Sequence, residues 1–168
     1  MIQFGGLPVI SLLKGAVIGG GLELASATHI RIADKTAFYQ LPEGRRGIFV
    51  GGGASVRIGR ILGADRMIEM MLTGRKYDAE NGLRLGLSHY VCDTEDDAKS
   101  KAEELAATVA ENAQLSNYVM IQALARIEDM AKADGLFTES LCAALTQTSE
   151  DAQEGLRAFL EKRAPNFK

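Results

Sequence analysis

The chain has 168 residues, of which 46% are hydrophobic and 24% charged, a composition ordinary for a soluble globular protein. Its formal net charge of −3 gives no reason to expect nucleic acid or an anionic membrane as a partner. The two cysteines, Cys92 and Cys142, have no metal-ligand spacing, and the sequence contains no secretory signal or membrane-spanning run. We therefore expect a cytoplasmic protein without a metal site.

The first half of the chain alternates short apolar runs with glycine-rich turns and helical patterns. Runs rich in β-branched or aromatic residues predict strands, and apolar residues at helical spacing predict helices. A proline and five glycines between residues 42 and 53 predict a loop. In chain order we expect a strand at 7–14, a helix at 20–28, strands at 29–34 and 36–41, helices at 53–62 and 64–73, a short helix from the cap Asp78 to Gly86, and a strand at 87–92.

From Asp93 onward the periodicity is helical and glycine is nearly absent. We expect helices at 95–113, 116–133, about 136–147 and 150–163. The composition thus divides the chain into a mixed α/β part, residues 1–92, and an all-helical part, residues 93–168. The two histidines, His29 and His89, lie near the start of predicted strands, and we expect structural roles for both.

The sequence "GGGLE" at residues 19–23 is unusual at the start of an apolar helix. Each glycine costs about 1 kcal/mol relative to alanine inside a helix. Glycines let a backbone approach a ligand closely, and the free N–H groups of a helix start stabilise developing negative charge. The spacing fits neither a Walker A loop nor a dinucleotide fingerprint. An oxyanion hole remains, with close packing as the alternative.

Two glutamates, Glu23 and Glu43, are separated by the two predicted strands that follow the first helix. A strand pair can return the chain to its starting point, so both carboxylates can face one reacting centre. Two carboxylates in an apolar, glycine-lined cleft suit acid–base chemistry on one substrate. The alternatives are that Glu23 caps or complements a helix dipole and that Glu43 is a solvated turn residue.

Several ordered motifs carry a family resemblance. Residues 7–63, including "GAVIGGGLELASATHIRI" and "LPEGRRGIFVGGG", resemble the core of the crotonase (enoyl-CoA hydratase/isomerase) superfamily, and residues 67–91 and 156–168 continue the match. Within the superfamily, these two motifs most resemble the subgroup that includes methylthioacryloyl-CoA hydratase. The resemblance implies an α/β fold, a crotonase-like ββα spiral followed by an all-helical region for oligomerisation.

The resemblance also implies residue roles in adding water across the 2,3-double bond of an enoyl-CoA. The Gly20 N–H would bind the thioester oxygen, Glu23 would take a proton from water, and Glu43 would deliver a proton to the α-carbon. The Gly51 N–H would position the water or the second glutamate. Coenzyme A would enter as part of the acyl-CoA substrate, with no other cofactor. Four further residues would line the substrate pocket: Gly19, Tyr39, Phe49 and Val50.

Family members carry a further segment before the equivalent of residue 7, so we expect the N-terminal half of the spiral to be missing. That segment holds the second oxyanion donor and part of the coenzyme A pocket in the family. By the same resemblance we expect a homotrimer or a dimer of trimers. The alternatives are an enoyl-CoA isomerase or another enolate-forming member, and a truncated, non-catalytic chain that only oligomerises.

Overall fold

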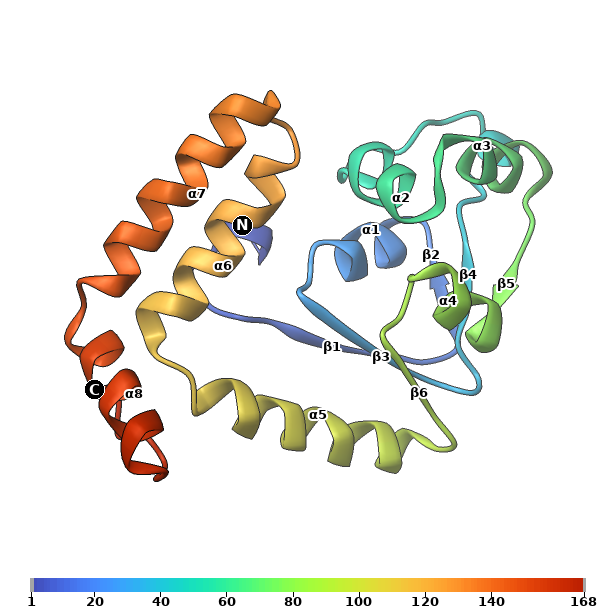
Figure 1. Cartoon of the computed structure of the whole chain (residues 1–168). Coiled ribbons are helices and arrows are strands. Elements are labelled where there is room, and N and C mark those ends of the chain that lie inside the picture. The colour runs from blue at the N-terminus through green and yellow to red at the C-terminus, as the bar shows by residue number, and fades with distance from the viewer. Residues whose placement is uncertain (1, 168) are drawn as a thin grey trace. The chain divides into compact units, whose positions relative to one another are not determined.

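The computed structural model describes residues 2–167 (Figure 1). The strands are β1 (Ile10–Leu13), β2 (Ala16–Ile18), β3 (Ile30–Asp34), β4 (Phe38–Gln40), β5 (Tyr77–Asp78) and β6 (Tyr90–Cys92). The helices are α1 (Gly20–Ser26), α2 (Ala54–Leu62), α3 (Ala64–Thr73), α4 (Ala79–Leu85), α5 (Glu95–Ala110), α6 (Gln114–Ile127), α7 (Lys132–Gln147) and α8 (Glu150–Glu161), with short 3-10 turns η1 (Ile2–Phe4) and η2 (Glu43–Arg46).

The chain forms two compact units, one centred on residues 9–105 and the other on residues 106–167 with residues 3–8. The first unit contains two three-stranded sheets, ordered β1-β3-β6 and β2-β4-β5. All neighbours are parallel except β4 and β5. Successive strands go to alternate sheets before the chain turns into a helix, so β1-β2-α1 and β3-β4-α2 repeat one ββα pattern (Figure 1). The predicted α/β class is confirmed.

The strand β3 is apolar because it lies in the centre of its sheet. Ile32 and Ala33 are fully buried, as expected for a parallel strand with neighbours on both sides. Two polar residues are buried in the same strand, and both are satisfied. Arg31 donates to the carbonyl oxygens of Leu87, at 2.8 Å, and Thr28, at 3.1 Å. Asp34 accepts from the N–H of Thr36 at 2.8 Å, which fixes the turn into β4.

The predicted elements of the first unit are all present, and two strands are additional. The strands predicted at 7–14 and 87–92 are shorter than expected, because β1 covers Ile10–Leu13 and β6 covers Tyr90–Cys92. The strands β2 and β5 have three and two residues, too short to produce a periodic signal. The loop predicted at 42–53 also contains η2. Asp78 caps α4 as predicted, since its Oδ1 accepts the Asn81 N–H at 2.8 Å.

The second unit is helical, and α6 and α7 pack side by side (Figure 1). The helix predicted over 116–133 is wrong at its end, because α6 stops at Ile127 and α7 begins at Lys132. The pairing of two helices requires a turn that overrides the helical propensity of the intervening residues. No helix within the described residues is long and apolar enough to cross a membrane.

Candidate active site

The parallel pairing of β2 and β4 brings the two glutamates to one edge of a sheet. Ile18 is in register with Gln40 at the ends of the two strands, and the Gly19 N–H donates to the Gln40 carbonyl at 3.0 Å. Glu23 follows β2 on α1, and Glu43 follows β4 on η2. Both glutamates therefore lie a few residues beyond the same end of two adjacent strands.

The three glycines before Glu23 differ in what surrounds them. Gly19 has a φ of 51°, a left-handed conformation that favours glycine, and a Cβ built on it would lie 3.1 Å from Glu43 Oε1. Gly20 and Gly21 are exposed, and a Cβ on either would have no neighbour within 4 Å. Close packing therefore does not account for Gly20 and Gly21. Their N–H groups belong to the first turn of α1, where an α-helix offers no intrahelical acceptor.

Glu23 is half-buried and reaches across to the start of α2. Its Oε1 accepts the N–H of Gly52 at 2.7 Å and that of Ala54 at 3.2 Å. The carboxylate thus complements the N-terminus of α2 rather than that of its own helix. A Cβ at Gly52 would lie 2.9 Å from Glu23 Oε2, so a larger residue there would displace the Glu23 carboxylate. Sequence reasoning singled out Gly51 and missed Gly52, although both belong to the same glycine run.

Glu43 is 6% exposed, so its interpretation as a solvated turn residue is wrong. The end of β4 and the turn η2 are each bound to the end of α3. Gln40 Nε2 donates to the Gly74 carbonyl at 2.5 Å, and Arg45 Nη2 donates to the Thr73 carbonyl. Within residues 2–167, the buried Oε2 of Glu43 has no hydrogen-bond partner. A buried, unpartnered carboxyl oxygen costs free energy, and a catalytic role is one reason for a protein to retain it.

The four other predicted positions lie in different surroundings. Tyr39 is fully buried, and its ring packs against Gly82, where a Cβ would lie 2.1 Å from Tyr39 Cε2. Val50 is buried in the same core, whereas Phe49 is 70% exposed. Gly51 is exposed, and a Cβ on it would have no neighbour within 4 Å. The pocket and water-positioning roles of these residues stay predictions.

Among the described residues, no three histidine, cysteine, aspartate or glutamate side chains gather as metal ligands do. Cys92 and Cys142 are free thiols. Glu23, Glu43 and the N–H groups of the first turn of α1 together offer proton transfer beside a site for developing negative charge.

Comparison with known proteins assigns the family. The enoyl-CoA hydratase/isomerase family model matches residues 1–168. The chain belongs to this family. Its crotonase-like α/β fold is shared with solved structures. A Rhodopseudomonas palustris protein, provisionally assigned as an enoyl-CoA hydratase, is 51% identical with a TM-score of 0.90, over 96% of this chain and 62% of that one. An enoyl-CoA hydratase from Bacillus anthracis is 30% identical with a TM-score of 0.90, over 99% and 64% of the two chains.

Curated relatives of this crotonase-family chain carry similar names. A probable enoyl-CoA hydratase from Bacillus subtilis is 37% identical over 96% of this chain and 62% of its own length. The probable mitochondrial enoyl-CoA hydratase 2 of Arabidopsis thaliana is 36% identical over 96% of this chain and 53% of its own length. The crotonase-family chain therefore spans 53% and 62% of the lengths of these two relatives.

Proposed function

We propose that this protein is an enoyl-CoA hydratase that uses Glu23 and Glu43 as its acid–base pair. The observation that carries the proposal is the burial of Glu43, whose Oε2 has no hydrogen-bond partner among residues 2–167. The glycine turn beside it starts α1, and the first N–H groups of a helix have no intrahelical acceptor. The enoyl-CoA hydratase names of several relatives support the same reaction. We also propose that the chain belongs to the subgroup of the family that includes methylthioacryloyl-CoA hydratase.

In the proposed reaction, Glu23 removes a proton from water as the water oxygen bonds to C3 of the enoyl thioester. The electron pair of the 2,3-double bond moves toward the thioester carbonyl, and the enolate oxygen binds the Gly20 N–H. Protonated Glu43 then donates its proton to C2. Both glutamates regain their starting protonation states by exchange with solvent, so the net change is addition of one water molecule. Backbone donors are effective here because they require no reorganisation as the charge develops.

The orientation of Glu23 supports its role as the base. Its Oε1 is engaged by two backbone N–H groups, which leaves Oε2 as the oxygen that meets water. We further propose that Gly51 helps to position this water and that Gly19, Tyr39, Phe49 and Val50 border the acyl group. Coenzyme A enters as part of the substrate, and the proposed steps use no additional cofactor.

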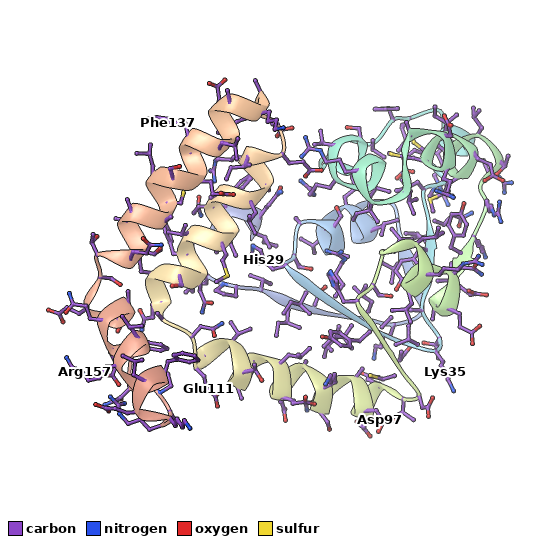
Figure 2. The ribbon with its side chains drawn as sticks, viewed as in Figure 1. His29, Lys35, Asp97, Glu111, Phe137 and Arg157 are labelled. Carbon is purple, nitrogen blue, oxygen red and sulfur yellow. The ribbon has the colours of Figure 1, made fainter. Side chains whose placement is uncertain are left out.

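We also propose that the helical unit binds further copies of the chain, as a trimer or a dimer of trimers. Large apolar side chains are exposed along its three helices α6, α7 and α8, and such patches mark association surfaces. They include Met120, Leu124, Leu136, Phe137, Leu141, Leu145, Leu156, Phe159 and Leu160. Figure 2 labels Phe137 on α7.

The test is the loss of enoyl-thioester absorbance when the purified chain is mixed with crotonyl-CoA. We expect turnover in the wild type and its near-abolition in Glu23→Gln and Glu43→Gln. Glu103→Gln, an exposed glutamate on α5, is the matched control and should retain full activity. Circular dichroism confirms that each variant is folded.

Two outcomes would contradict the proposal. If Glu23→Gln keeps full activity while Glu43→Gln abolishes it, one carboxylate suffices and an isomerase is favoured. If the folded wild-type chain shows no turnover, the hydratase proposal fails for this chain and a non-catalytic oligomerising role is favoured.

A further inference from the structure

We infer that Arg57 is a positioning residue that fixes the carboxylate of Glu23 for catalysis. Arg57 lies in the first turn of α2, which begins at Ala54. The inference rests on the proposed function for the catalytic role of Glu23, but its structural part depends only on the contacts of Arg57. These contacts join the helix that carries Glu23 to the loop that holds the Glu23 side chain.

The guanidinium of Arg57 reaches three acceptors around Glu23. Its Nη2 donates to the Glu23 carbonyl at 3.1 Å and also to the Gly52 carbonyl. Its Nε donates to Ser26 Oγ at 3.0 Å, and this hydroxyl in turn donates to the Glu23 carbonyl at 2.7 Å. Glu23 and Gly52 are themselves joined by a hydrogen bond from the Gly52 N–H to the Glu23 carboxylate. Arg57 therefore binds the backbone carbonyls of both partners of this hydrogen bond.

This arrangement forms a closed loop of contacts. Gly52 donates its N–H to Glu23 Oε1 at 2.7 Å, and its carbonyl accepts from Arg57. Releasing Arg57 frees the Gly52 carbonyl, so the loop residue whose N–H binds Glu23 Oε1 loses an anchor. The Glu23 carboxylate is then held mainly by the Ala54 N–H, at 3.2 Å, and we expect its direction to be less well fixed. Because acid–base catalysis depends on the placement of the reacting oxygen, a displacement of about 1 Å costs on the order of 100-fold in rate.

The backbone at Gly53 leaves the space that the Arg57 guanidinium occupies. Gly53 has a φ of 97°, and a Cβ on it would lie 2.5 Å from Arg57 Nη1. The guanidinium of Arg57 thus packs against the backbone of Gly53, whose positive φ and missing side chain both favour glycine. A planar guanidinium presents donors in several fixed directions, which an ammonium does not, so lysine cannot reproduce all three contacts.

The structural test uses amide NMR spectra of the isotope-labelled full chain, with the Gly52 amide proton as the reporter. A hydrogen bond to a carboxylate shifts an amide proton strongly, so Glu23→Gln defines the shift expected when this bond is weakened. We expect Arg57→Gln to move the Gly52 resonance most of the way to the Glu23→Gln position. Arg57→Lys should move it partway. The matched control is Arg66→Gln, because Arg66 Nη1 also donates to a backbone carbonyl, that of Leu62 at 3.1 Å, and it should leave Gly52 unchanged.

An unchanged Gly52 resonance in folded Arg57→Gln overturns the inference. Should Arg57→Gln fail to fold, Arg57→Lys is judged by the same criterion. In crotonyl-CoA assays we expect both variants to lower kcat about 10- to 100-fold with little change in KM, and a merely structural role would instead lower the amount of folded enzyme. If Glu23→Gln retains full activity while Arg57→Gln shifts the Gly52 resonance, the catalytic role of Glu23 fails and the positioning contact stands.

Discussion

The two glutamates of the site differ sharply in how well the fold satisfies them. Glu23 accepts two backbone N–H groups through Oε1, whereas Glu43 is buried with Oε2 unpartnered within the described part of the chain. A carboxyl held in that way is retained at a cost in stability. Proteins commonly sacrifice stability in this manner where catalysis needs a reactive group.

The first prediction follows from this difference. Replacing Glu43 with methionine, an apolar side chain of similar size, should raise the free energy of unfolding by about 1 kcal/mol. Glu23→Met should lower the free energy of unfolding by about 0.5–2 kcal/mol, because it removes the acceptor at the start of α2. Urea unfolding followed by circular dichroism measures both. Destabilisation by Glu43→Met to the same extent as Glu23→Met would show that Glu43 is a structural residue.

Two helical glycines give a second prediction at the scale of single residues. A Cβ at Gly82 in α4 would lie 2.1 Å from Tyr39 Cε2, whereas a Cβ at Gly155 in α8 would have its nearest neighbour, in Phe167, at 3.6 Å. Gly82→Ala should therefore lower the free energy of unfolding by about 1–3 kcal/mol through overpacking. Gly155→Ala should raise the free energy of unfolding by up to about 1 kcal/mol through helix propensity.

Thermal and urea unfolding of these two alanine variants provide the check. We expect Gly82→Ala to lower the free energy of unfolding and Gly155→Ala to raise it. An equal effect of both would show that the ring of Tyr39 moves aside and that the core around it is loosely packed.

At the scale of elements, the two histidines fasten the β1-β3-β6 sheet in the same way. The backbone N–H of His29, labelled in Figure 2, donates to the Val9 carbonyl at 3.0 Å, and its ring Nδ1 accepts the Val9 N–H at 2.9 Å. The backbone N–H of His89 donates to the Arg31 carbonyl at 2.8 Å, and its ring Nδ1 accepts the Arg31 N–H at 3.0 Å. In each contact a histidine side chain and its backbone bind the neighbouring segment much as a paired strand residue would. The contacts agree with the structural roles predicted for both residues.

The His89 contact predicts a pH dependence of stability. Desolvation and the nearby Arg31 guanidinium lower the pKa of His89, so the folded state resists a proton that the unfolded chain accepts below about pH 6.5. Stability is therefore full above that pH and falls as the pH drops through it. His89→Asn supplies an acceptor that does not titrate and should flatten this part of the curve.

Urea midpoints of the wild type and His89→Asn, measured between about pH 7 and pH 5, test this prediction. The wild-type midpoint should fall more steeply with acidification than that of the variant. Parallel curves would show that His89 does not contribute to the acid sensitivity.

Much of the element order was predictable because it depends on local pattern. The strand β3 and the helices α2 and α3 follow from short-range signals, as does the cap Asp78. The strand β2 was not predictable, because its three residues form a strand only through pairing with β4. The bond from Gly52 to Glu23 spans 29 residues in sequence, and the burial of Glu43 depends on the end of α3. Neither feature has a local sequence signal.

At the scale of the whole molecule, the exposed apolar side chains of α6, α7 and α8 predict self-association. Phe137 on α7 is 66% exposed and becomes covered in the proposed oligomer. Phe137→Glu should lower the molar mass measured by sedimentation equilibrium, because it places a charge in an apolar interface. Lys132→Glu, an exposed change on the same helix, should leave the mass unchanged. A monomeric wild type would contradict the oligomer.

We propose that this chain adds water to an enoyl thioester. The most direct measurement is mass spectrometry of the product formed from crotonyl-CoA in isotopically labelled water. We predict a product heavier by one labelled water molecule, with the label in the hydroxyl at C3, and no such product with Glu43→Gln. Consumption of substrate without gain of water, or a folded chain that leaves crotonyl-CoA unchanged, would contradict the hydratase account.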